Sequence, residues 1–255
     1  MNKISLCMIV RNEARNIIQC LEHALPFVDE VVIVDTGSTD ATIEICEKKK
    51  IKVYSIPWEN DFSKARNYSI EIAKYDWILC LDADEEVIIE DPIAFKESLT
   101  NNQDLFYVQM QHYETHNLDN LNNSHVSYHF RLFNKSSSLT YEGKIHERLQ
   151  ISNKMRYTLN KFIKINHFGY GQNNKNEKCI RNLTMLLEDW NKTPDNMWLN
   201  YHIASEFFKQ NEISTAYKMV NRALQLSIDN NCKPPAIYYK LKYEILLYAR
   251  TTVNV

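Results

Sequence analysis

Short apolar segments alternate with amphipathic segments along the first third of the chain. Four apolar segments have the length and composition of buried strands, at residues 4–10, 31–34, 51–56 and 77–81. Three segments between them carry apolar residues at helical spacing, at residues 14–25, 39–49 and 61–74. Strands and helices that alternate in this way form βαβ units. We therefore predict an α/β fold with a mostly parallel, Rossmann-like sheet and helices on both faces.

The middle of the chain is mixed, and the last third is helical. We predict a short helix at 92–99 and further strands at 105–111, 129–133 and 162–167. The polar segment 112–128 is rich in Asn and His and is either an acceptor-side loop or a variable surface loop. Further helices are predicted at 178–191, 196–209, 213–227 and 235–249.

The helical part resembles a helical repeat. Small and large apolar residues recur there at the spacing of a tetratricopeptide (TPR) helix pair, at Ile203, Ala204, Phe207, Ala216, Val220 and Ala223. Because repeats need neighbours to bury their faces, an ordinary helical appendage is the alternative. We predict two domains, residues 1–172 and 173–255, and regard the all-α part as a candidate homodimer interface.

Charge, hydropathy and cysteine usage narrow the class of protein. The 30 basic and 32 acidic residues leave a formal charge of −2, whereas a nucleic-acid groove or a polybasic membrane patch would leave a stronger basic signal. No apolar run approaches the ~18 residues that cross a bilayer, and residues 11–13 end the first apolar stretch too early for a signal peptide. The cysteines form no C-x-x-C pair. We therefore expect a cytoplasmic protein with reduced thiols, no transmembrane segment and no nucleic-acid partner.

Glycine is scarce, and its scarcity limits how the chain can bind phosphate. The chain has four glycines, where average usage would give about 18. Their positions allow neither a G-x-G-x-x-G loop nor a Walker A loop. A nucleotide site would therefore need another way to neutralise the phosphates.

The strongest chemical signal follows the fourth predicted strand. Asp82, Asp84, Glu85 and Glu86 crowd carboxylates just past an apolar segment. Mg²⁺ or Mn²⁺ would relieve their repulsion and would bind substrate phosphates at the same time. An exposed acidic turn is the plain alternative. Asp35 ends the second predicted strand, and because ligands of such sheets bind where strands end, we expect Asp35 and Asp82 at one rim.

Two further segments lie near that rim. Residues 34–40, VDTGSTD, end a strand with Asp35, whose carboxylate could accept the ring N–H of uracil, and Gly37 permits a tight turn close to the base. A strand, turn and helix without a ligand is the alternative. Residues 61–67, DFSKARN, place Arg66 on a helix, where it faces the carboxylates, a phosphate or solvent.

Six segments in order resemble family 2 glycosyltransferases with the GT-A fold: SLCMIVRNEARNI, VDEVVIVDTGSTDAT, NDFSKARNYSI, DWILCLDADEE, RLFNKSSSLTYEGKIHERL and INHFGY. The chain most resembles the branch that includes bacterial β-glucosyltransferases of surface glycans and sublancin-type peptide S-glycosyltransferases, and the latter carry a TPR-like C-terminal part. The resemblance implies metal-dependent transfer of a hexose, with glucose favoured, from a UDP-sugar with inversion. The chain lacks the ED and Q-x-x-R-W elements of processive synthases.

The resemblance also implies roles for individual residues. It places eight of them in the donor site: Val10, Asn12, Glu13, Asp35, Arg66, Asp82, Ala83 and Asp84. Of these, Asp35 would contact uracil, Asp82 would contact the ribose or orient its neighbours, and Asp84 would bind Mg²⁺ or Mn²⁺.

The catalytic base is expected within residues 141–147, YEGKIHE. The family pattern of an aromatic residue followed by G-x-[I/V]-H-E favours His146 and Glu147 over Glu142. In a strand these two side chains would point to opposite faces, so one of them would address the donor. We therefore keep Glu147 as a candidate base and His146 as a candidate base or metal ligand.

The acceptor and the competing functions stay open at this point. A Cys or Ser of a bacteriocin-like peptide is favoured over a lipid-linked or wall glycan, because no clear membrane-seeking amphipathic segment is present. A sugar nucleotidyltransferase would need a glycine-rich loop, and a phosphatase would need its D-x-D motif after the first strand. The non-catalytic alternative is a helical-repeat adaptor with a degenerate transferase domain, and the intact Asp35, Asp82 and Asp84 argue against it.

Overall fold

The computed structural model describes residues 2–100, 102–113, 125–168 and 175–252. It divides into two compact units, Met1–Gly171 and Gln172–Val255, which we describe separately. The domain boundary expected after residue 172, together with Gly169 and Gly171, falls at 169–174, outside the described residues. The position of that boundary therefore stays a prediction.

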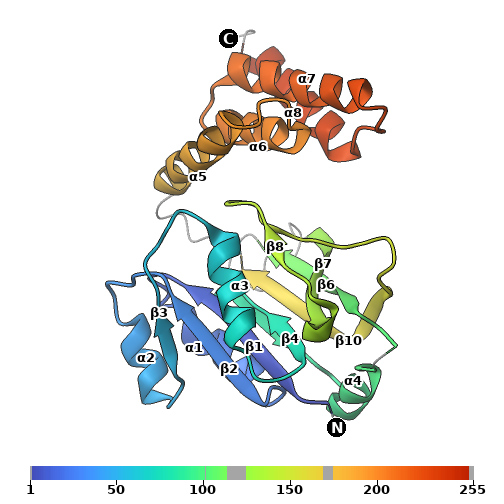
Figure 1. The fold of residues 1–255 in the computed structure, drawn as a ribbon. Helices are drawn as coiled ribbons and strands as arrows, with labels where there is room; N and C mark the ends of the chain where they lie inside the picture. Colours follow the sequence, from blue (N-terminus) through green and yellow to red (C-terminus); the bar gives the residue numbers. More distant parts are fainter. Residues whose placement is uncertain (1, 101, 114–124, 169–174, 253–255) are drawn as a thin grey trace. The chain divides into compact units, whose positions relative to one another are not determined.

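An eight-stranded sheet of described residues forms the centre of the first unit (Figure 1). Its strands are β1 Ile4–Val10, β2 Glu30–Asp35, β3 Val53–Ser55, β4 Trp77–Cys80, β5 Glu85–Ile88, β6 Leu105–Tyr113, β7 His125–Asn134 and β10 Tyr157–Phe168. Across the sheet they run in the order β3-β2-β1-β4-β7-β6-β10-β5. A separate two-stranded sheet consists of β8 Tyr141–Glu142 and β9 Arg148–Leu149.

The four apolar segments of the first third form the parallel half of the sheet. β1 pairs in parallel with β2 and β4, and β2 pairs in parallel with β3. The register pairs Val10 with Asp35 and Cys7 with Cys80, so β1, β2 and β4 end at one edge of the sheet. β1 is buried along almost its whole length, as expected for a strand that is covered on both faces. The predicted α/β fold is confirmed.

The other half of the sheet is mixed and brings further strand ends to the same edge. β7 is antiparallel to β4 and β6, β10 is parallel to β6, and β5 is antiparallel to β10. β6 and β10 therefore end, and β7 and β5 begin, at the edge where β1, β2 and β4 end. The acidic segment after β4 becomes strand β5, in which Glu85 and Glu86 are buried. The alternative of an exposed acidic turn is wrong for these two residues.

The polar segment expected as a loop at 112–128 is shorter than predicted. β6 extends to Tyr113, and β7 begins at His125. The remainder, 114–124, lies outside the described residues, so its role on the acceptor side stays a prediction.

Helices cover both faces of the sheet. One apolar core lies under α1 and α4, with Leu21 and Phe95 buried, and a second core on the opposite face includes Ile70 of α3. Aspartates begin two helices: Asp61 accepts from a backbone amide of α3 at 2.9 Å, and Asp91 does the same for α4. The helices are α1 Ile17–Ala24, α2 Thr42–Lys48, α3 Phe62–Ile72 and α4 Pro92–Ser98.

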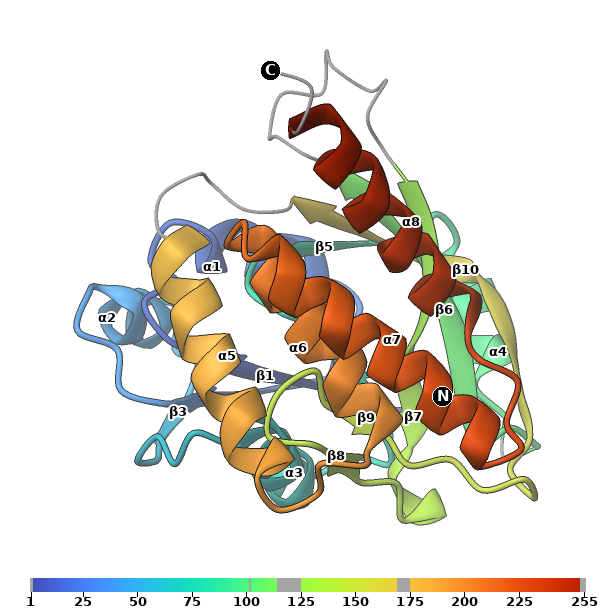
Figure 2. The same cartoon turned by 90° about the horizontal axis from the view of Figure 1, so that it is seen from above.

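The described part of the second unit consists of α5 Lys175–Trp190, α6 Met197–Lys209, α7 Ile213–Asp229 and α8 Ala236–Thr252. α6 and α7 lie alongside one another (Figure 2) and bury small apolar residues between them, such as Ala204, Ala216 and Val220. The predicted helical C-terminal segment is confirmed. No described helix combines the length and the hydropathy that a bilayer crossing requires.

Candidate active site

The loops that follow β1 and β2 are tied together by hydrogen bonds between side chains and backbone. The Asn12 side-chain oxygen accepts from the backbone amide of Thr39 at 2.7 Å, and the backbone amide of Asn12 donates to the Ser38 hydroxyl at 2.9 Å. The Glu13 amide donates to the Thr42 hydroxyl at 2.8 Å. Asn12 and Glu13, both expected at the nucleotide, therefore share one loop structure with the turn after β2.

Asp35 is the last residue of β2, and its carboxylate accepts hydrogen bonds from the turn that follows. It is 1% exposed, and its Oδ2 accepts from the amides of Gly37 and Ser38 at 2.9 and 3.0 Å. Gly37 has a φ of 105°, which a residue with a Cβ adopts only with strain. The Thr36 amide joins the turn to β1 by donating to the Val10 carbonyl at 3.0 Å. Asp35 thus shapes the turn where uracil is expected, and its contact with the base stays a prediction.

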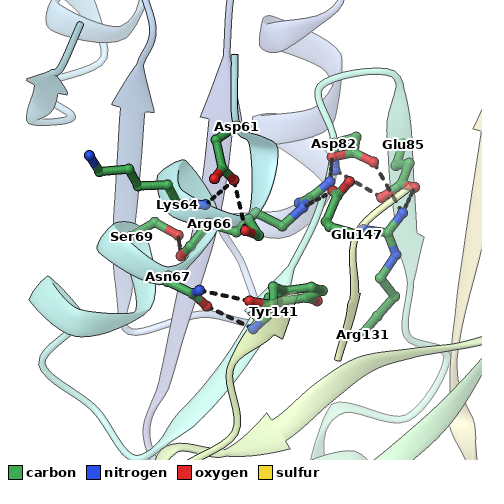
Figure 3. A network of polar contacts seen from close by, with 11 residues as sticks. Asp61, Lys64, Arg66, Asn67, Ser69, Asp82, Glu85, Arg131, Tyr141 and Glu147 are labelled. Carbon is green, nitrogen blue, oxygen red and sulfur yellow. Dashed lines mark hydrogen bonds and ion pairs between the residues drawn. The ribbon is translucent and has the colours of Figure 1, made fainter. Parts of the chain in front are cut away.

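Five charged side chains meet just beyond the end of β4 (Figure 3): Arg66, Asp82, Glu85, Arg131 and Glu147. Arg66 is buried on α3 and donates to Asp82 Oδ1 at 2.7 Å and to Glu147 Oε1 at 2.5 Å. Arg131 donates to Asp82 Oδ2 at 3.1 Å and to Glu85 Oε1 at 2.5 Å. Arg66 therefore faces the carboxylates, and Asp82 lies between two guanidinium groups.

A β-bulge aims Arg131 into this charged cluster. The pairing of β6 with β7 shifts between Phe106, which faces Leu132, and Tyr107, which faces Phe130. Arg131 is the extra residue between these two pairs, and bulges re-aim side chains in this way next to functional sites. Arg131 and Glu85 are not among the binding or catalytic residues expected from the sequence. One feature of the sequence points to Arg131: it is a charged residue among the apolar residues in the second half of β7.

Burial and charge act against each other in the charged cluster. Burial raises the pKa of Asp82, but the guanidinium groups of Arg66 and Arg131 outweigh it and hold that pKa well below its usual range. Burial raises the pKa of Glu85 to about 7 against the opposing charge of Arg131, and Asp82 adds to the rise. The two arginines therefore keep Asp82 ionised, whereas buried Glu85 takes up a proton more readily than an ordinary glutamate.

Asp84 lies just beyond this cluster, next to a histidine. Its side chain is 25% exposed, and its Oδ2 lies 3.5 Å from Nε2 of His167 near the end of β10. The Phe168 amide donates to the Asp84 carbonyl at 3.1 Å, so β10 also holds the backbone of this turn. Burial lowers the pKa of His167, but the hydrogen bond and the charge of Asp84 outweigh it and raise that pKa overall. Buried Ala83 separates Asp84 from Asp82.

The side chains around Asp84 fit a divalent cation that also binds phosphate. Among the described residues, no three His, Cys, Asp or Glu side chains are grouped so as to hold a metal ion. Mg²⁺ commonly takes one or two carboxylates and completes its shell with water and substrate phosphates, and imidazole is a further ligand of divalent transition metals. Asp84 and His167 would therefore hold a cation together with a phosphate-bearing substrate.

The segment expected to supply the base is a loop. β8 ends at Glu142 and β9 begins at Arg148. Between them Gly143 and His146 have φ values of 98° and 53°, which lie outside the range of a regular strand. The expectation that His146 and Glu147 alternate along a strand is therefore wrong.

Helix α3 holds this loop in place at three points, one of which is the Phe62 amide, which donates to the Lys144 carbonyl at 2.8 Å. The Asn67 side chain donates to the Tyr141 carbonyl at 2.9 Å and accepts from the Tyr141 amide at 2.8 Å. Arg66, one residue earlier, binds Glu147 at the other end of the loop. Glu147 is 12% exposed in its side chain. The roles of Glu147 and His146 in catalysis stay predictions.

The fold and the motifs of the first unit belong to a known class. The family model of Glycosyl transferase family 2 matches residues 5–167. The chain belongs to this family, and the predicted resemblance is confirmed. Its match to the structure of S. aureus TarS 1-349 in complex with UDP-GlcNAc has a TM-score of 0.51 at 17% identity and covers 94% of this chain and 83% of that one. That match supports the GT-A fold.

Two curated relatives extend the comparison beyond the first unit. The chain is 29% identical over 98% of its length to the TPR repeat-containing protein Synpcc7942_0270 of Synechococcus elongatus. It is 27% identical over 77% of its length to the SPbeta prophage-derived glycosyltransferase SunS of Bacillus subtilis. The chain spans 62% of the first relative and 47% of the second.

The charged cluster predicts a large effect for loss of its central arginine. Arg66→Met removes the guanidinium group, keeps much of the stem and leaves Asp82 and Glu147 each without one partner. We expect a loss of about 3–5 kcal/mol in the free energy of unfolding, the usual result of breaking a buried pair. Urea denaturation of the full chain measures this loss.

Lys64→Met on the same helix is the matched control. Lys64 pairs with Glu59 at 2.5 Å, but both side chains are more than half exposed. We expect a loss below about 1 kcal/mol for this variant. Equal effects of the two substitutions would contradict the compensating role assigned to Arg66.

Proposed function

We propose that the chain transfers a hexose from a UDP-sugar to an acceptor, with inversion at the anomeric carbon and with a divalent cation in the donor site. One observation carries this proposal: the two aspartates of the D-x-D motif differ in their surroundings. Asp82 forms ion pairs with both Arg66 and Arg131, whereas Asp84 faces His167, although the two aspartate side chains are similarly exposed, at 33% and 25%. The first carboxylate is compensated within the protein, and the second is placed to meet a cation. Membership of family 2 supports the reaction class.

The donor would lie across the strand ends. Uracil would contact Asp35, and the turn at Gly37 would let the base approach the backbone. Asn12 and Glu13 would line the nucleotide from the loop after β1. The diphosphate would lie at Asp84, where bound Mg²⁺ or Mn²⁺ would neutralise the charge that develops on the departing UDP. A chain with four glycines could bind a diphosphate in this way without a glycine-rich loop.

In the transfer step, the nucleophilic atom of the acceptor attacks the anomeric carbon on the face opposite to the diphosphate. A bond forms between these two atoms, and the bond from the anomeric carbon to the diphosphate oxygen breaks, with its electron pair leaving on UDP. A base accepts the proton of the acceptor. This order of events inverts the configuration at the anomeric carbon.

Glu147 is the first candidate for the base. Arg66 holds its Oε1 at 2.5 Å, so the carboxylate is oriented and its Oε2 would accept the proton. His146, the preceding residue of the same loop, is the second candidate for the base, and it would alternatively bind the cation. His167 has the better geometric support as a cation ligand, because its Nε2 lies 3.5 Å from Asp84.

The favoured acceptor is a Cys or Ser of a bacteriocin-like peptide, and the favoured sugar is glucose. The resemblance to sublancin-type peptide S-glycosyltransferases and the helical second unit support this choice. A cell-surface glycan, either a lipooligosaccharide or a wall polymer, is the alternative acceptor. A non-catalytic helical-repeat adaptor is the alternative for the whole chain, and the second unit is the candidate dimer interface.

The cation role of Asp84 predicts a loss of activity without a loss of fold. We expect Asp84→Asn to lower UDP release from UDP-glucose by at least ~100-fold, because a cation that stabilises developing charge is worth several kcal/mol. We also expect EDTA to abolish wild-type release and added Mn²⁺ or Mg²⁺ to restore it. A coupled assay for UDP, with circular dichroism as a check of folding, measures these effects.

Asp91→Asn is the matched control for this substitution. Asp91 accepts hydrogen bonds from the first amides of α4, and asparagine caps helices equally well. We expect wild-type UDP release from this variant. Unchanged release by Asp84→Asn would contradict the cation role, and absence of release by the wild-type chain with every UDP-sugar and cation would favour the adaptor.

Mass spectrometry tests the acceptor. We expect the full chain, incubated with UDP-glucose, Mn²⁺ and Cys- or Ser-containing peptides, to add one hexose to a peptide. Replacement of the modified Cys or Ser by Ala should abolish the addition. Transfer to glycan acceptors alone would refute the peptide acceptor and leave the transferase proposal in place.

A further inference from the structure

Several histidines of the described residues lie together at the edge of the sheet that carries the proposed site. His112 lies near the end of β6, His125 and His129 lie in the first half of β7, and His167 lies near the end of β10. The strand register pairs His167 with His112 and His112 with His125. Three imidazole rings therefore occupy adjacent positions on three strands. His112, His125 and His129 have no role in the transfer step described above.

A chain of close polar contacts leads from His167 to His129. Nδ1 of His167 lies 3.0 Å from Nδ1 of His112. Nε2 of His112 lies 2.6 Å from the hydroxyl of Ser127, and that hydroxyl lies 2.7 Å from Nε2 of His129. Both nitrogens of His112 are thus engaged, one toward His167 and one toward Ser127. The ring of His125 stacks on His112, with centroids 4.3 Å apart and 6° between the planes.

One direction of donation satisfies the contacts described above when Nε2 of His167 offers its lone pair to a cation. His167 then carries its proton on Nδ1 and donates to Nδ1 of His112. His112 carries its proton on Nε2 and donates to Ser127, whose hydroxyl donates to His129. A neutral imidazole has one donor and one acceptor nitrogen. The opposite tautomer of His112 would set two N–H groups against each other at its contact with His167.

We propose that His112, anchored by Ser127, is a positioning residue that sets the tautomer and ring orientation of His167 and thereby strengthens cation binding at Asp84. The inference rests on the proposed function, because it requires a cation in the donor site. Histidines that bind metals commonly donate their second nitrogen to a fixed acceptor, and loss of that acceptor typically lowers metal affinity about 10–100-fold. In this chain the acceptor is the neighbouring imidazole of His112.

Titration of the full chain with Mn²⁺ in the presence of UDP, followed by electron paramagnetic resonance, tests this role without a transfer assay. We expect His112→Ala to weaken Mn²⁺ binding about 10–100-fold and to leave UDP binding without the cation unchanged. His112→Asn should bind Mn²⁺ nearly as tightly as the wild type, because its side-chain oxygen lies where Nδ1 lies. His125→Phe, which keeps an aromatic ring for stacking, is the control and should match the wild type.

Two results would overturn this inference without affecting the proposed function. The first is an unchanged Mn²⁺ affinity in His112→Ala. The second is a loss of affinity in His112→Asn as large as that in His112→Ala, which would indicate that His112 acts through packing and not as a hydrogen-bond acceptor. If the wild-type chain with UDP binds no Mn²⁺, the cation site of the proposed function falls together with this inference. Wild-type binding and transfer with either of the first two results would leave the proposed function standing.

NMR identification of the histidine tautomers tests the inference on the wild-type chain, without any substitution. Long-range ¹⁵N–¹H spectra of the chain with Mg²⁺ and UDP identify the protonated nitrogen of each imidazole. We expect the proton on Nδ1 of His167 and on Nε2 of His112. A proton on Nδ1 of His112 would overturn the inference, even if His112→Ala fails to fold.

Discussion

The proposed site depends on two arginines that compensate three carboxylates at the edge of the sheet. Asp82, Glu85 and Glu147 gather at the end of β4, and in this partly buried place their repulsion would have to be relieved by protonation or by exposure to water. Arg66 and Arg131 relieve it with directed hydrogen bonds of 2.5–3.1 Å. The two arginines therefore bind all three carboxylates and keep Asp82 ionised before any ligand binds, while the raised pKa of Glu85 indicates that its charge is only partly compensated. Asp84 faces His167 and the proposed cation.

The topology of the sheet explains why these groups meet. The parallel strands end at one edge, and the antiparallel strands β5 and β7 begin there, so this edge collects residues from all eight described strands of the sheet. Arg66 and Glu147 lie 81 positions apart in the sequence and still form a direct pair. The same geometry aligns His112 with His167 and places His167 next to Asp84. Charge compensation and the proposed support of the cation ligand thus follow from one arrangement of strands.

The local pattern of apolar and polar residues is sufficient to predict most strands and helices of the chain, since periodicity and capping residues are local properties. It also placed Asp35 and Asp82 at one edge and Arg66 on a helix near them. The strand at Glu85 could not be predicted, because four charged or apolar residues become a strand only by pairing with β10. The sequence does not predict that Arg131 pairs with Asp82 or that His167 lies beside Asp84, for a related reason. A bulge in β7 decides where Arg131 points, and the register of β10 decides where His167 lies, and distant residues set both.

The central claim is that Asp84, with His167, holds the cation while Asp82 is compensated by arginines. Anomalous diffraction from crystals grown with Mn²⁺ and UDP tests it most directly. The account predicts a manganese peak about 2.0–2.3 Å from an Asp84 carboxylate oxygen and from Nε2 of His167, with Asp82 still bound to Arg66 and Arg131. A manganese ion bound by Asp82 after displacement of the arginines, or held by His146 away from His167, would contradict it.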